Sequence, residues 1–220
     1  MIISIHIKNC SGTQVRQGLK DHFQAALFED KGDETGSTWP SSLAKRERQQ
    51  KNTQESKALF LDKFKAIHGH FNRRKYEILG NHCRYISFMR DPVSRVIANY
   101  DTLKNQPNSN QTEALIVNKL GFSLEEYIQH PDARNIQSRY LQSTTLKEYE
   151  FIGLTEKYEE SIKKLNTQFD LSLSSTLPTE AEEHTSKEYE ISNALAQLIK
   201  DCNPHDMELY ALAIEKFNKA

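Results

Sequence analysis

The chain of 220 residues lacks the features that mark several large classes of protein. Its three cysteines, Cys10, Cys83 and Cys202, have no paired spacing, which argues against a disulfide framework and against the usual zinc sites. No apolar run approaches the ~20 residues that cross a bilayer. The first residues lack the basic segment and the small-residue cleavage site of a secretory signal. We therefore expect a soluble, cytoplasmic protein without a membrane span.

Neither sign of charge is in excess, because 29 Lys and Arg residues stand against 30 Asp and Glu residues. A net charge of −1 excludes a generally basic protein that coats nucleic acid or membranes, although local patches remain open. A chain of this length can bury roughly 70% of its unfolded surface. We expect one domain over residues 1–220, with a polar insertion around residues 29–57, and the oligomeric state stays open.

Glycine is scarce, and its contexts exclude two nucleotide-binding motifs. None of the eight glycines precedes a lysine, so the Walker sequence of nucleotide triphosphatases is absent. The dinucleotide fingerprint G-x-G-x-x-G is absent as well. A Walker-type ATPase or kinase is therefore disfavoured.

The pattern that is present alternates strands with helices. Apolar, β-branched runs predict strands over residues 2–7, 66–71, 84–89 and 149–154. Apolar residues at helical spacing predict the helices, which cover residues 13–27, 58–64, 92–100, 112–119, 123–129, 132–141, 158–169 and two closing segments. Asp91 and Pro92 are a suitable N-cap and first residue for the third of these helices. This alternation predicts an α/β fold with a central, mostly parallel sheet flanked by helices.

A short loop of small and polar residues, Asn9-Cys10-Ser11-Gly12-Thr13-Gln14, connects the first predicted strand to the first predicted helix. Such loops bind phosphate through backbone N–H groups and the positive end of the helix. On its own, this loop is better explained as an ordinary connection between a strand and a helix.

Charged and titratable residues at other strand ends leave similar alternatives. Arg90 ends a predicted central strand, where it could bind a phosphate or pair with a carboxylate, and Arg95 allows the same two interpretations. His68 and His70 share one face near the end of another strand, where one could act as a base. A metal is not expected, because a third ligand at suitable spacing is missing. The basic runs 45–48 and 73–75 are typical of solvated surface.

Five segments, in this order along the chain, resemble the carbohydrate sulfotransferase families that include heparan sulfate 2-O-sulfotransferase and many bacterial relatives. The most specific is Arg90-Asp91-Pro92 with Arg95, and the segments are residues 6–13, 68–71, 88–97, 135–141 and 152–158. The tail from Asn203 to Phe217 continues the resemblance.

The resemblance implies a P-loop-like fold and 3′-phosphoadenosine 5′-phosphosulfate as the donor substrate. The loop from Cys10 to Gln14 would wrap its 5′-phosphosulfate, Arg90 would hold its 3′-phosphate, and His70 would be the catalytic base. The implied partners are this donor and a glycan or glycoconjugate acceptor, with no nucleic acid and no metal. Animal members carry a membrane anchor that this sequence lacks, so a bacterial, cytoplasmic version is expected.

Two positions depart from the family pattern. The catalytic lysine of the loop falls on Asn9, so either Lys8 takes its place through a shift of one residue or the lysine is missing. A serine that contacts the 3′-phosphate is replaced by Ala98, beside Asn99, which we keep as a candidate donor contact. These departures favour an alternative in which the protein binds a nucleotide or an anionic glycan without catalysis. A kinase-like transferase is a weaker third hypothesis.

Overall fold

The computed structural model describes residues 1–30, 57–106, 112–176 and 191–219. Its centre is a five-stranded sheet in which all pairings are parallel and the strand order is β2-β3-β1-β4-β5. The strands are β1 (Ile2–Ile5), β2 (Leu27–Asp30), β3 (Ala66–Gly69), β4 (Arg84–Met89) and β5 (Tyr149–Leu154). The predicted α/β fold with a mostly parallel sheet is confirmed.

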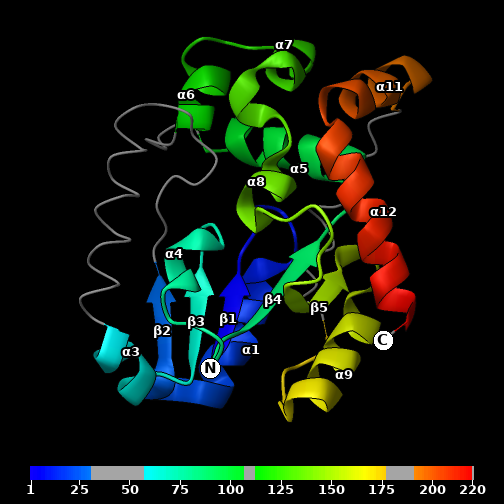
Figure 1. Ribbon diagram of the computed structural model, residues 1–220. Helices are drawn as coiled ribbons and strands as arrows, with labels where there is room; N and C mark the ends of the chain where they lie inside the picture. The colour runs from blue at the N-terminus through cyan, green and yellow to red at the C-terminus, as the bar shows by residue number, and fades with distance from the viewer. Residues whose placement is uncertain (31–56, 107–111, 177–190, 220) are drawn as a thin grey trace.

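The three middle strands are buried on both faces, as in a sheet that is covered by helices on both sides. Every residue of β1 and β3 is buried, and five of the six residues of β4 are buried. Helix α1 (Gly12–Phe23) contacts β2 and β3, whereas α9 (Tyr158–Phe169) and α12 (Pro204–Lys219) contact β5. Figure 1 shows α9 and α12 beside β5, at one side of the sheet.

A second group of helices packs beyond the carboxyl ends of the strands, toward which the arrows in Figure 1 point. These helices are α5 (Pro92–Lys104), α6 (Thr112–Asn118), α7 (Leu124–Gln129), α8 (Ile136–Leu141) and α11 (Asn193–Cys202). Apolar residues of α5, α6, α7 and α11 form their own cluster around Val96, Tyr127 and Ile199. The carboxyl edge of the sheet therefore faces a separate helical layer. The short helices α3 (Lys57–Lys63) and α4 (Arg74–Glu77) precede and follow β3 in the chain. No helix among the described residues is long and apolar enough to cross a membrane.

The strand β2 corrects the sequence prediction, which extended the first helix to Leu27 and began a polar insertion at Glu29. The helix instead ends at Phe23, because Gln24 has a left-handed φ of 48° that breaks the helical pattern. Leu27 is buried in the edge strand, while Glu29 pairs with Arg16 and Asp30 with Lys75. An edge strand tolerates such charged residues, which hid it from the hydrophobic pattern. Residues 31–56 of the predicted insertion lie outside the described residues.

A further correction concerns the helix predicted over residues 132–141. The structure has a 3-10 turn at Pro131–Ala133 and then α8 from Ile136. Asn135 separates them, because its φ of 52° cannot continue a helix. Within the described ranges, further 3-10 turns lie at Gln24–Ala26 and Thr155–Lys157.

Candidate functional site

The loop between β1 and α1 presents the N-terminus of a twelve-residue helix at the carboxyl edge of the sheet. Asn9 and Ser11 both adopt left-handed backbone conformations, with φ of 61° and 55°. Ser11 is the N-cap residue, yet no side chain accepts a hydrogen bond at this cap. Backbone N–H groups of the first turn thus lack the usual side-chain acceptor, and together with the helix dipole they favour an anion.

Gly12 is required by a close contact within this loop. A Cβ atom at this position would lie 1.7 Å from the imidazole of His6, so any larger residue would displace that ring. The first turn of α1 therefore packs directly against His6, the residue that follows β1. Thr13 is exposed and Gln14 half-buried in the first turn, whereas Cys10 is buried.

Three histidines meet at the ends of the neighbouring strands β1 and β3. The rings of His6 and His70 stack with their centroids 4.0 Å apart, and the ring of His68 lies 5.1 Å from that of His6. The parallel pairing of Ser4 with His68 places them side by side, and Ser4 Oγ lies 2.9 Å from His68 Nδ1. Among the described residues, no three His, Cys, Asp or Glu side chains are arranged to hold a metal ion.

The hydrogen bonding of His70 fixes which nitrogen can accept a proton. Its Nδ1 lies 2.9 Å from the main-chain oxygen of His6, and because a carbonyl only accepts, Nδ1 carries the hydrogen. Nε2 of the neutral ring is then left with the lone pair. Burial and the nearby Lys8 charge lower the pKa of His70 to about 4, so the ring is neutral near pH 7. His70 therefore has the tautomer and charge of a general base.

Lys8 and Asn9 point to different parts of the molecule. The Asn9 amide donates to the Ala98 carbonyl oxygen at 3.2 Å and to the Thr102 hydroxyl at 2.9 Å, so it is bound to α5. The Lys8 ammonium lies 2.9 Å from a carboxylate oxygen of Glu113 on α6 and also lowers the pKa of His70. The cation beside His70 is therefore Lys8, which leaves the Asn9 side chain in a structural role.

Arg90 lies at the same edge, one residue after β4, and its guanidinium Nη1 donates to the Asn9 carbonyl oxygen at 3.4 Å. Gln137 of α8 holds the main chain of Arg90 on both sides. The Gln137 amide accepts from the Arg90 N–H at 3.0 Å and donates to the Arg90 carbonyl at 2.9 Å. Arg90 and the loop are thus brought together, as the sequence predicted.

Two other predicted residues lie deeper in the helical layer. Arg95 is fully buried, donates to the Ala133 carbonyl at 3.4 Å, and has no partner for Nε or Nη1 among the described residues. Asn99 is buried as well and donates to the Tyr127 hydroxyl on α7. The Asn99 amide is therefore already engaged with α7. Ala98 offers no hydroxyl at the position where the family has a serine.

The thiol of Cys10 is unsuited to nucleophilic chemistry. Burial raises its pKa to about 12, although Arg95 and Arg90 act in the opposite direction. The thiol lies 3.5 Å from the Lys8 carbonyl oxygen and 3.6 Å from Gln137 Oε1. Cys10 is therefore a packed, neutral member of the loop.

Three residues of the site were not singled out by the sequence. Glu113 pairs with Lys8, Gln137 holds Arg90, and Asp206 accepts from the backbone N–H groups of Gln137 and Ser138 at 3.1 and 2.8 Å. Gln137 and Asp206 lie within segments that resembled the family, whereas no sequence signal pointed to Glu113. In the basic run 73–75, Arg73 pairs with Glu77 and Lys75 with Asp30, whereas residues 45–48 lie outside the described residues.

Comparisons with known proteins concern the chain as a whole. Among solved structures, the chain is similar to mouse sulfotransferase SULT7A1 complexed with PAP, with 16% identity and a TM-score of 0.39. The match covers 87% of this chain and 65% of the mouse chain, so this chain spans less than two thirds of the length of that protein. No curated protein sequence matches the chain. The model of the sulfotransferase family matches residues 1–213, and the chain therefore belongs to the sulfotransferase family.

Proposed function

We propose that this protein transfers a sulfuryl group from 3′-phosphoadenosine 5′-phosphosulfate to a hydroxyl group of a carbohydrate. Membership of the sulfotransferase family supports the reaction class. The observation that carries the proposal is the meeting of an uncapped helix N-terminus, the Lys8 ammonium and the neutral His70 ring at one sheet edge. The carbohydrate acceptor, a bacterial origin and action in the cytoplasm are parts of the same proposal, and they follow from the resemblance of the sequence.

The chemistry requires a base on one side of the sulfur atom and positive charge on the other. His70 Nε2 takes the proton of the acceptor hydroxyl while its oxygen attacks sulfur in line. The bond from sulfur to the phosphate oxygen breaks, and 3′,5′-adenosine bisphosphate leaves with the electron pair. Lys8 and the backbone N–H groups at the start of α1 neutralise the charge that develops on this phosphate.

Arg90 binds the 3′-phosphate of the donor in this proposal. Its main chain is fixed by two hydrogen bonds to Gln137, so the guanidinium extends from a well-fixed backbone position next to the loop. A guanidinium can engage a phosphate with two parallel hydrogen bonds. With Ala98 in place of a serine, Arg90 carries more of this interaction alone.

Binding of the donor product tests the site directly. Calorimetric titration with 3′,5′-adenosine bisphosphate should show one site, and Arg90→Ala should weaken it at least tenfold. Arg84→Ala is the matched control, because Arg84 begins the strand that Arg90 follows and pairs with Glu150 at the far end. Absence of binding, or equal binding by Arg90→Ala, would refute the donor site.

Turnover tests the base. With isotopically labelled donor and a mixture of glycans, His70→Ala should lose transfer of label while it keeps bisphosphate binding. The exposed His205 provides the control variant His205→Ala, which should retain activity. Undiminished transfer by His70→Ala would show that His70 is not the base.

A catalytically degenerate protein that binds a nucleotide or an anionic glycan is the second candidate. The specific observations that favour it are the pairing of Lys8 with Glu113 and the missing hydroxyl at Ala98. It predicts bisphosphate or glycan binding by the unmodified protein without any labelled product. The same two experiments therefore separate the candidates.

A further inference from the structure

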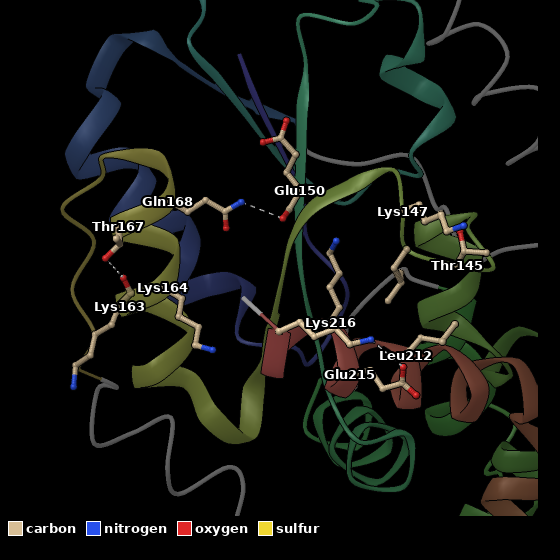
Figure 2. Close-up of a pocket in the computed structure, with 12 residues that line it drawn as sticks. Thr145, Lys147, Glu150, Lys163, Lys164, Thr167, Gln168, Leu212, Glu215 and Lys216 are labelled. Carbon is tan, nitrogen blue, oxygen red and sulfur yellow. Dashed lines mark hydrogen bonds and ion pairs between the residues drawn. The ribbon is translucent and has the colours of Figure 1, made fainter.

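The two edges of the sheet differ in how their side chains are arranged. At the amino edge, a pocket of about 810 Å³ lies between the segment before β5, α9 and α12. Figure 2 shows Lys147 and Lys163 on different sides of this pocket, with Lys163 pointing away from it, so these groups do not form one site. At the carboxyl edge, in contrast, the rings of His68 and His70 both lie against the ring of His6. The proposed reaction gives His6 no role so far.

The register of the strands places His6 directly beside His70. Ile5 pairs with Gly69 in the parallel ladder of β1 and β3, and the next N–H along, that of His6, donates to the Gly69 carbonyl at 2.8 Å. The side chains that follow this pair project from the same face of the sheet. Their rings stack with centroids 4.0 Å apart and an angle of 25° between the planes. The ring of His6 therefore lies nearly flat against the proposed base.

The other neighbour of the His6 ring is the donor loop. A Cβ atom at Gly12 would lie 1.7 Å from Cδ2 and 2.1 Å from Nε2 of His6, so this edge of the ring meets the first residue of α1. One imidazole ring thus contacts both the start of α1 and the ring of His70. The spacing between the backbone N–H groups of α1 and the base depends on this ring.

The ring of His6 is neutral near pH 7. Burial, followed by the charges of His70, His68 and Arg16, holds the pKa of His6 well below its usual value. His70 becomes an imidazolium when it takes the proton of the acceptor, and a second imidazolium at position 6 would repel it. A neutral ring can instead remain stacked on His70 in both of its charge states.

We propose that His6 is a positioning residue for His70, and that its ring fixes the plane of the base and the distance of the base from the donor loop. The main-chain carbonyl of His6 accepts from His70 Nδ1 and so selects the tautomer. The stacked ring adds the orientation, because it restricts rotation of His70 about its Cβ–Cγ bond. A displacement of about 1 Å at a reacting group can cost a factor of about 100 in rate. This inference rests on the proposed function, since it assumes that His70 is the base.

Magnetic resonance of protein with isotopically labelled histidine nitrogens tests the positioning without any turnover. The nitrogen shifts report which ring nitrogen carries the hydrogen, and the spectrum of His70→Ala identifies the His70 signals. We expect one tautomer, with the hydrogen on Nδ1, in the unmodified protein and in His6→Phe, which keeps a flat aromatic face. In His6→Ala, the two nitrogen signals of His70 should approach each other as the tautomers exchange. If His6→Ala fails to fold, His6→Leu takes its place, because leucine fills the space without a flat face.

Transfer of label from isotopically labelled donor measures the consequence for the reaction. His6→Ala should lower kcat about thirtyfold, because the base is less well placed, and should change the affinity for 3′,5′-adenosine bisphosphate by less than about threefold. His6→Phe should retain kcat within about threefold of the unmodified protein. The control is His22→Ala, at an exposed position of α1, which should change neither quantity.

Three results would overturn the positioning role. They are unchanged His70 signals in folded His6→Ala, full kcat in that variant, and an equal loss of kcat in His6→Phe and His6→Ala, which would show that the flat face is not what matters. If the unmodified protein transferred no label, the proposed reaction would fail. The nitrogen signals would then decide by themselves whether His6 positions His70.

Discussion

At the scale of single residues, the unusual feature of the site is an acidic side chain next to a loop suited to anions. Glu113 is buried, and its carboxylate holds the Lys8 ammonium at 2.9 Å. A phosphate at the start of α1 would have to share Lys8 with this carboxylate and would be repelled by it. Glu113 therefore opposes binding of an anionic donor and keeps Lys8 in place when the donor is absent.

Replacing Glu113 by Gln keeps the size of the side chain and removes its charge. We expect three- to tenfold tighter binding of 3′,5′-adenosine bisphosphate, because repulsion of about 1 kcal/mol is removed at a partly buried site. Calorimetric titration measures the change. Glu125→Gln, at an exposed position on α7, is the control and should leave the affinity unaltered. Unchanged or weaker binding by Glu113→Gln would contradict this role.

The chemistry of the site was partly predictable from the sequence. The loop of small residues, Arg90 and His70 occupy strand ends, where parallel sheets place their ligands, so their positions made them candidates. Their individual roles came only from the resemblance to the sulfotransferase family. The partner of Lys8 was hidden, because Glu113 lies 105 positions along the chain on a different helix. The orientation of the Asn9 side chain could not be predicted for the same reason, since it depends on a hydrogen bond to α5.

At the scale of elements, the clearest predictions concern strands with strong apolar patterns. The bounds of β4 and β5 agree with the sequence prediction because both strands are framed by turn residues and buried on both faces. The short edge strand β2 was not predicted, because two of its four residues are acidic and it pairs with residues 66–69, which are distant in the sequence. A local hydrophobic pattern does not predict a strand that is stabilised mainly by pairing with a segment distant in the sequence.

Helix α8 illustrates how an element too short to be stable alone is used to hold the site. It has six residues, and its N-terminus is capped by the Asp206 carboxylate of α12. In return, the Asn135 side chain accepts from the backbone N–H groups of His205 and Asp206 at the start of α12. The two helices thus cap each other, and this fixes Gln137 against Arg90.

Replacing Gln137 by Met tests this arrangement. The side chain keeps its length, but the Arg90 N–H and carbonyl lose their partners in a buried place. We expect the free energy of unfolding to fall by about 2 kcal/mol, as is typical of unsatisfied buried polar groups. Bisphosphate affinity should fall about fivefold, because Arg90 is less firmly placed. Urea denaturation and calorimetry measure the two effects.

The control for this change is Gln129→Met on α7, where the amide donates to the Glu125 carbonyl at an exposed position. It should change both quantities little. If Gln137→Met were as stable and bound as tightly as the control, Arg90 would not depend on α8 for its position.

At the scale of the whole molecule, the stacked histidines couple folding to pH. Burial lowers the pKa of His68 to about 3 and that of His70 to about 4, and burial with the other two rings lowers the pKa of His6. In the unfolded chain these groups titrate near 6.5. Between about pH 4 and pH 6.5, the unfolded state therefore binds more protons than the folded state.

The free energy of unfolding should consequently fall as the pH is lowered from 7.5 to 5.5. His68 and His70 should each contribute about 1 kcal/mol over this range, a window above the usual titration of carboxylates. Urea denaturation at several pH values measures the slope. His70→Ala should flatten it, because one buried ring no longer resists protonation, whereas His205→Ala at an exposed site should leave it unchanged. A free energy of unfolding that is constant from pH 7.5 to 5.5 would show that the three rings accept protons within the folded protein. His70 would then lose, near pH 6, the neutral state that the proposed reaction needs.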